Sequence, residues 1–282
     1  KAEIEKWINF LIFISVTYTI IGFLQFFFVP DLTFLTVYGW DPHQKRLVST
    51  FLDPNFTGGF LAISLSFAIS FFLETKRKFY LVSSALIFLG ILLTFSRSSY
   101  LALAFVILII GLLRSPKILL MFAFAFLVSF LLISQIRSRI VGAFSIDETS
   151  QARIESWQKA TTIFAKNPVL GVGFNNYRFA QNRYGYFEQD ETLGGHSGAG
   201  SDSSILLVAA TTGIIGLSAY LFLLAALFKQ FAKKALTSPL HLAATASFVA
   251  LIIHSMFVNS LFFPQILIPF WFIVGIISAN DS

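Results

Sequence analysis

Two arginines beside apolar runs are the residues in this sequence best suited to binding an anionic substrate. Arg46 precedes Asp53-Pro54-Asn55, and Arg97 lies in the polar stretch 94–99 between two apolar runs. A guanidinium can hold a diphosphate bidentately, but near a membrane it can also snorkel or bind lipid phosphate nonspecifically. Turn chemistry explains Asp53 and Pro54, with Asn55 as a possible cap of the helix that follows.

A histidine and a carboxylate follow in the flexible stretch 196–204. His196 and Asp202 stand among glycine, alanine and serine residues, directly before an apolar run. Either group could act as a general base. Asp202 could instead cap the next helix, because a carboxylate is favoured at the positive end of a helix.

The stretch 151–166 has helical spacing, with Trp157 and other apolar residues on one side. This spacing predicts an amphipathic helix lying at the membrane surface. Asn167-Pro168 should end it, because proline disfavours continuation of a helix. Gly171 and Gly173 have no βαβ context, so they predict a glycine turn rather than a dinucleotide site.

Aromatic residues alternate with arginines after this turn, beginning at Tyr177 and Arg178. Such residues can stack on sugars and bind anions, or they can form an interfacial belt. Within the apolar runs, His254 is the main ionisable residue. It is a candidate proton relay or ligand, since burying an ionisable group in a membrane is costly. A neutral, hydrogen-bonded histidine at a helix contact is the alternative.

Composition limits what these residues can belong to. The chain is 56% hydrophobic and 12% charged, whereas soluble domains are about 25% charged. It has no cysteine, so disulfides and cysteine-ligated metals are excluded. Its four histidines show no paired ligand spacing, and we expect neither a metal nor a cofactor. The net charge of +6 comes from short basic clusters between apolar runs, which argues against a nucleic-acid partner.

Apolar runs predict an all-α, polytopic transmembrane helical bundle with about eight spans. The eight runs are residues 7–29, 56–73, 79–95, 100–113, 118–134, 204–228, 242–258 and 262–278. The fourth is short for a full span. We divide the chain into helices 1–5 (residues 1–134), an extracytoplasmic loop with short amphipathic helices (135–202) and helices 6–8 (203–282).

The basic clusters predict the orientation. They follow the second, fourth and sixth runs and precede the first, so eight spans place all four on one side. The positive-inside rule makes that side cytoplasmic, which leaves residues 30–55, 96–99 and 135–202 outside. Because the chain begins with Lys1 rather than Met, we expect that an N-terminal portion precedes it.

The order of four motifs resembles the superfamily of O-antigen ligases and O-antigen polymerases. These motifs are RLVSTFLDPN (46–55), TFSRSSYL (94–101), RIESWQKATTIFAKNPVLGVGF (153–174) and DSSILLVAATTGIIG (202–216). The resemblance covers most of the chain from residue 46 to about residue 230. It implies a multi-pass glycosyltransferase of a bacterial or archaeal cytoplasmic membrane that acts in polysaccharide biosynthesis of the cell envelope.

Such enzymes transfer a glycan from an isoprenoid (undecaprenyl) diphosphate carrier to an acceptor hydroxyl, without a metal. By position, Arg46, Arg97 and Arg153 would bind the diphosphate, while Asn55, Tyr177 and Arg178 would contact the acceptor or glycan. Membrane lipid and other polysaccharide-assembly proteins are the further partners expected.

One position departs from the family pattern. The family's catalytic histidine precedes a small polar residue, nine residues and Gly-x-x-Gly, and here Asp202 stands in its place before Ser203. Asp202 is then the expected base or acceptor-orienting group, with His196 nearby. Polymerase-like members are the better relatives, while a ligase or a protein O-oligosaccharyltransferase remains an alternative.

Two readings outside transfer chemistry stay open. A transporter or flippase of lipid-linked glycans would also bind a diphosphate, but it should show a polar midplane cavity and broken helices. The nearly uncharged runs, with polar residues concentrated outside them, favour chemistry at the outer interface. The aspartate at position 202 also leaves room for a noncatalytic assembly partner with the same fold.

Overall fold

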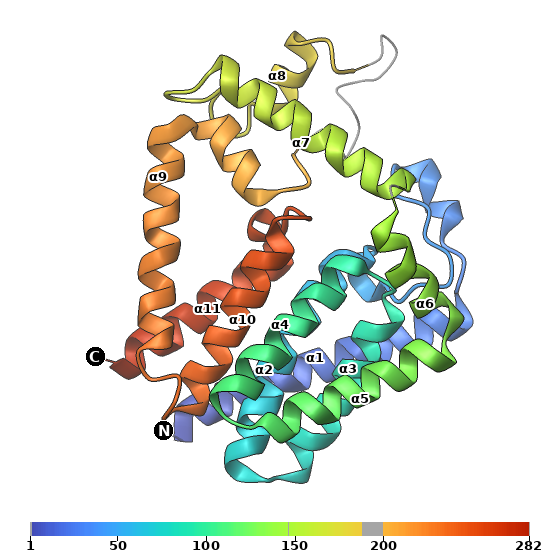
Figure 1. Ribbon diagram of the computed structural model, residues 1–282, viewed down its shortest axis with the longest axis vertical. Coiled ribbons are helices and arrows are strands. Elements are labelled where there is room, and N and C mark those ends of the chain that lie inside the picture. The colour runs from blue at the N-terminus through green and yellow to red at the C-terminus, as the bar shows by residue number, and fades with distance from the viewer. Residues whose placement is uncertain (1, 146, 188–199, 282) are drawn as a thin grey trace.

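The computed structural model describes residues 2–145, 147–187 and 200–281, and the fold is all-α (Figure 1). Eight apolar helices form the bundle. They are α1 (Ala2–Phe28), α2 (Pro54–Thr75), α3 (Lys78–Leu93), α4 (Arg97–Leu113), α5 (Pro116–Leu132), α9 (Ser204–Ala232), α10 (Pro239–Ser255) and α11 (Pro264–Asp281). Each of the eight predicted apolar runs overlaps one of these helices.

Helix length bears on how many of these elements cross a membrane. The helices α1, α2, α9 and α11 are long and apolar enough to do so alone. Helix α5 and the short helix α6 (Ser134–Val141), bent by 101° at their junction, would make a fifth span if counted together. Helices α3, α4 and α10 are shorter, and 17 residues reach only about 25 Å. The chain is therefore a multi-pass membrane protein, and eight full spans stay a prediction.

Helix α2 lies at the centre of the bundle, in contact with α3, α4 and α10. Two adjacent glycines permit the close approach. A Cβ on Gly58 would lie 2.0 Å from Ser99 Oγ of α4, and one on Gly59 would lie 3.0 Å from the His254 ring of α10. Small residues let membrane helices pack closely, because dispersion and hydrogen bonds replace the hydrophobic effect between them.

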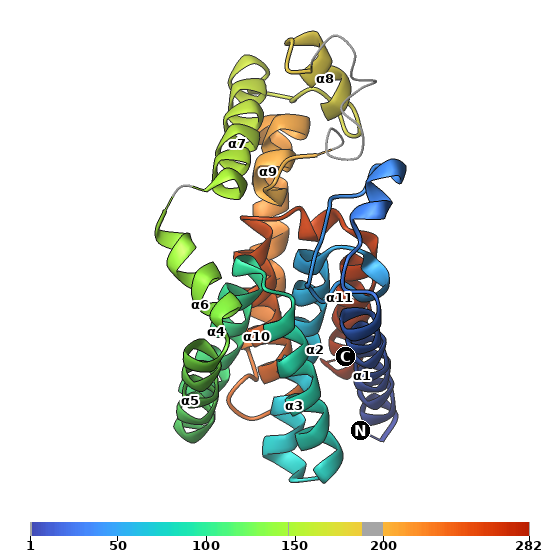
Figure 2. The ribbon, with the colours of Figure 1, turned by 90° about the vertical axis from the view of Figure 1, so that its right-hand side faces the viewer.

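The turns that carry the basic clusters meet at one end of the bundle. Arg114 donates to Glu74 and to the carbonyl of Leu236, which joins the α4–α5, α2–α3 and α9–α10 turns. Arg77 pairs with Glu5 of α1 at the same end. Figures 1 and 2 show these turns and the N-terminus at the lower end of the molecule. The clusters thus share one side, as predicted, while the assignment of that side to the cytoplasm stays a prediction.

The opposite end carries the extramembrane helices α7 (Glu148–Lys166) and α8 (Tyr177–Arg183) (Figure 2). Asp147 caps α7 by accepting a hydrogen bond from the Ser150 amide, and α7 ends at Asn167, ahead of Pro168. This confirms the predicted helix and its stop. A small separate core holds these helices together. It includes Ala160 and Ile163 of α7, Tyr177 and Ala180 of α8, and Ala210 of α9.

Helix α9 is broken at Gly213, whose backbone angles (φ 65°, ψ −166°) are not helical. The glycine turn after α7 fills the break: Val172 and Gly173 donate to the carbonyls of Ala210 and Thr211. In return, the amides of Ile214 and Ile215 donate to the carbonyls of residues 168 and 169. The predicted sixth run, 204–228, is thus two helical pieces. The break is tolerated because the turn satisfies the backbone groups that it frees.

Candidate functional site

A cluster of polar side chains lies where α2 and α4 begin, at the end opposite the basic turns. Asn55 Oδ1 accepts hydrogen bonds from Ser96 Oγ at 2.7 Å and from Ser98 Oγ at 3.5 Å. Asp53, and not Asn55, is the cap of α2, because its Oδ1 accepts from the amides of residues 55 and 56. Pro54 fills the first helical position, where no amide is needed. The Asn55 side chain is thereby free to bind the serines of α4.

Arg46 lies against this cluster and belongs to the loop that joins α1 to α2. Its Nε donates to the Thr94 carbonyl at 2.9 Å, and its Nη2 donates to the Phe95 carbonyl at 3.3 Å. Burial lowers the pKa of Arg46 to about 10, with Arg139 of α6 acting in the same direction. At neutral pH it stays a cation, held at the ends of α3 and α4 with its charge unpaired by any described carboxylate.

Arg97 begins α4 and is largely buried. Its Nη2 donates to Asp147 Oδ1 at 2.9 Å, and its Nη1 donates to the Gly142 carbonyl at 3.1 Å. Burial of Asp147 acts to raise its pKa, but hydrogen bonds from Arg97 and Ser150 lower that pKa to about 2. Arg97 therefore fixes the start of α7 over the bundle, which is a positioning role in addition to the predicted binding role.

Arg153 of α7 and Asp202, which precedes α9, lie close enough for their charges to act on each other. The Asp202 amide donates to Ser156 Oγ at 2.9 Å, and Trp157 Nε1 donates to the Asp202 carbonyl at 3.3 Å. Burial raises the pKa of Asp202, and the nearby Arg153 charge opposes this rise. Ser203, rather than Asp202, caps α9. The Asp202 carboxylate thus has no capping duty and is available as a base.

The other predicted site residues lie on α8 or outside the described residues, and His254 lies in α10. Tyr177 is 2% exposed and packs in the small core, so its ring serves the docking of α8. Arg178 is half-buried on the same helix. His196 lies outside the described residues. His254 is fully buried, with Nδ1 2.5 Å from Ser260 Oγ, and its Nε2 has no hydrogen-bond partner within the part of the chain that the structure describes.

The fold also brings together residues that the sequence analysis did not select. Asp41 and His43 of the loop between α1 and α2 lie beside Asp53, with one ligand atom of each within 4.8 Å of the others. Burial lowers the pKa of His43, while Asp53 acts to raise it and Arg46 to lower it. Arg139 lies near the same group. The Asp-x-His spacing at 41–43 was the available signal, but the third ligand lies ten residues later and only the fold brings it close.

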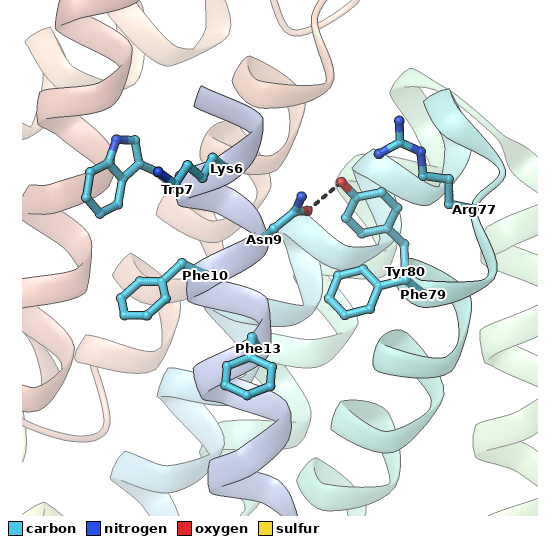
Figure 3. Close-up of a pocket in the computed structure, with 8 residues that line it drawn as sticks. All are labelled: Lys6, Trp7, Asn9, Phe10, Phe13, Arg77, Phe79 and Tyr80. Carbon is cyan, nitrogen blue, oxygen red and sulfur yellow. Dashed lines mark hydrogen bonds between the residues drawn. The ribbon is translucent and has the colours of Figure 1, made fainter. Parts of the chain in front are cut away.

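A cavity of about 720 Å³ lies elsewhere, against α1 and α3 near the basic turns (Figure 3). Its lining includes the rings of Trp7, Phe10, Phe13 and Phe79, and the Tyr80 hydroxyl donates to Asn9 Oδ1 at 2.7 Å. Trp7, Phe10, Phe13 and Phe79 are all exposed, as expected of side chains that face lipid. This cavity contains none of the predicted site residues.

Comparison with known protein families agrees with the motif order. The family model described as O-antigen ligase matches residues 82–221, which run from within α3 to within α9. The matched region includes Arg97, Arg153 and Asp202, and it lies downstream of Arg46. No curated protein matches the chain. Three findings identify the chain as a member of the O-antigen ligase superfamily. They are the family match, the all-α membrane fold, and the hydrogen bonds between the glycine turn after α7 and the break in α9.

Proposed function

We propose that the protein transfers an oligosaccharide from an isoprenoid-diphosphate carrier to an acceptor hydroxyl at the outer face of the cytoplasmic membrane. Its family comprises glycan ligases and polymerases that act on lipid-linked glycans in membranes. Within that family, the polymerase-like reaction is our proposal, in which the acceptor is a second lipid-linked glycan. The aspartate at the family's histidine position is the reason for preferring it over the ligase reaction.

One observation carries the proposal: arginines from three separate segments lie close enough for their charges to act on one another, and the charge of Arg153 also acts on the half-buried Asp202 carboxylate. Burial lowers the pKa of Arg153, while the Asp202 charge acts to raise that pKa and the Arg97 charge to lower it. The Arg153 charge in turn acts to lower the pKa of Arg46. Clustered cations repel one another, and an anion bound between them offsets this repulsion by attracting each of them. A diphosphate is such an anion, and fixed cations would stabilise the charge that develops on it as a leaving group.

The residues suggest how the transfer would run. The acceptor oxygen attacks the anomeric carbon, and the bond from that carbon to the diphosphate oxygen breaks. Asp202 takes the hydroxyl proton, as its raised pKa makes it a stronger base than an exposed carboxylate. Arg46, Arg97 and Arg153 receive the diphosphate, and Arg97 also holds α7 through Asp147 so that Arg153 stays in place.

A transporter of lipid-linked glycans is the alternative from another class. The break in α9 is a feature that transporters also show. However, the freed backbone groups at Gly213 bind the turn after α7 instead of lining a cavity. This arrangement favours a rigid extramembrane platform over a gate.

The test is a transfer assay with purified protein in vesicles and a radiolabelled undecaprenyl-diphosphate oligosaccharide. Wild type should give a ladder of longer lipid-linked glycans, and Asp202→Asn should lose at least 100-fold in rate. Glu155→Gln, an exposed carboxylate change on α7, is the matched control and should keep activity. Movement of the carrier across the vesicle without any transfer would refute the enzyme and favour the transporter. Transfer to one discrete acceptor would refute the polymerase in favour of a ligase.

A further inference from the structure

The outer loop between α1 and α2 gathers one imidazole and two carboxylates at the start of α2. Asp41 and His43 come from the loop, and Asp53 is the residue that caps α2. One nitrogen and two carboxylate oxygens of this group all lie within 4.8 Å of one another. The hydrogen bond from the Leu32 amide to the His43 carbonyl holds the segment that carries Asp41 and His43 in place within the loop.

His43 is the residue that points to a ligand. It is 9% exposed, and its buried Nε2 has no hydrogen-bond partner among the described residues. The nearest acidic atom is Asp53 Oδ2 at 3.9 Å, beyond hydrogen-bond distance. A buried polar nitrogen without a partner is costly, so it indicates an ion or other group that the protein is built to bind.

The two carboxylate oxygens of Asp53 have different surroundings: one caps α2 and the other faces this site. Oδ1 accepts the amides of residues 55 and 56 and so caps α2. Oδ2 accepts no hydrogen bond from a described residue and faces His43. The neighbouring Arg46 does not neutralise the group directly, because its guanidinium donates to the Thr94 and Phe95 carbonyls. Asp41 is exposed and gives an ion access from solvent.

We propose that Asp41, His43 and Asp53 bind one divalent transition-metal cation, of the Mn²⁺ or Zn²⁺ class, with water completing its coordination. One imidazole and two carboxylates form a mixed set of nitrogen and oxygen ligands. Such a set suits these ions better than it suits Mg²⁺ and Ca²⁺, which prefer oxygen ligands alone. Ligands about 2.0–2.2 Å from a metal lie at most about 4.4 Å apart. The observed 4.8 Å therefore closes with shifts of a few tenths of an ångström.

This binding does not depend on the proposed transfer reaction. The cation would tie the outer loop to the cap of α2, directly beside Arg46. The competing explanation is that His43 is protonated and bridges the two carboxylates without any metal. The two explanations predict opposite results for a direct binding measurement.

The experiment measures Mn²⁺ binding to the full chain in lipid nanodiscs, by equilibrium dialysis and electron paramagnetic resonance. We expect one saturable site per chain and a coupling from an imidazole nitrogen to the bound Mn²⁺. His43→Gln should abolish that coupling and weaken binding at least tenfold. Asp53→Asn should also weaken binding at least tenfold, and it keeps an oxygen that can cap α2.

The matched control is Glu155→Gln, which removes an exposed carboxylate from α7 and should leave binding unchanged. Size-exclusion profiles establish that each variant is folded. Absence of saturable Mn²⁺ and Zn²⁺ binding to folded wild type would overturn the proposal. Binding that His43→Gln leaves unchanged would overturn it equally, because the ion would then sit on surface carboxylates alone.

Discussion

At Gly171, a substitution that adds a single methyl group should separate the glycine turn after α7 from the break in α9. The residue has a left-handed backbone (φ +66°), and a Cβ there would lie 2.3 Å from the Thr211 carbonyl carbon of α9. Ordinary contacts of this kind are 3.4–4 Å. Gly171→Ala should therefore push the turn after α7 away from the break in α9. The turn would then lose the hydrogen bonds from Val172 and Gly173 to the Ala210 and Thr211 carbonyls.

The cost of Gly171→Ala follows from two terms. A left-handed conformation costs a residue with a Cβ about 1–2 kcal/mol. Loss of two backbone hydrogen bonds adds about 0.5–1.5 kcal/mol each. The sum is about 2–5 kcal/mol for this substitution. Two other glycines separate the terms: Gly185 is also left-handed (φ +70°) but has nothing within 4 Å, and Gly275 has neither feature.

The assay is hydrogen exchange of the amides at 172 and 173, together with thermal unfolding in detergent. Gly171→Ala should speed exchange at these amides about 30- to 4,000-fold, since the cost of about 2–5 kcal/mol is a factor of ten for every 1.4 kcal/mol. Gly185→Ala should lower stability by the conformational cost alone, about 1–2 kcal/mol. Gly275→Ala should lower neither quantity. If Gly171→Ala costs no more than Gly185→Ala, the close packing of the two motifs does not stabilise the fold and the reasoning is refuted.

Three further predictions concern the charged and polar residues of the candidate site. Because Arg153 lowers the raised pKa of Asp202, Arg153→Gln should move the acidic limb of the kcat/KM profile to higher pH. Arg153→Lys should keep the limb in place, and an unchanged limb in Arg153→Gln would exclude Asp202 as the base. Asp147→Asn keeps an oxygen that can cap α7 but removes the charge that pairs with Arg97. Hydrogen exchange of the amides in the first turn of α7 should therefore become severalfold faster, while the amides of α9 stay protected. Asn55→Ala leaves Ser96 without its acceptor and should lower the free energy of unfolding by about 1–3 kcal/mol, measured in detergent, with Asn55→Asp losing less.

The sequence alone determined the helices and their general arrangement. Apolar runs too long for a soluble surface predict membrane helices, because no other local structure satisfies the backbone in lipid. The basic clusters predict which turns share a side, and Arg114 and Arg77 confirm it by joining those turns. Asn167-Pro168 predicts the end of α7 from steric exclusion within a few residues. Each of these properties depends on neighbours in the chain.

Two local details were left open by the sequence and decided by the structure. Asn55 was one candidate for the cap of α2, but Pro54 favours the first helical position and leaves the cap to Asp53. Asp202 could have capped α9, but Ser203 does so. In both cases two adjacent polar residues compete for one cap. Which of the two residues forms the cap depends on backbone angles that the residue types do not fix.

Only the tertiary structure decided which distant residues meet. Sequence spacing could not place Arg46 against the carbonyls of Thr94 and Phe95, nor Asp53 against His43. It also could not show that α9 breaks at Gly213, because the run is apolar throughout and reads as one span. The break is stable only since the turn after α7 supplies hydrogen bonds from another part of the chain. Helix formation is a local balance of backbone and side-chain energies, whereas a site is built from contacts between segments, and those exist only after the segments have packed.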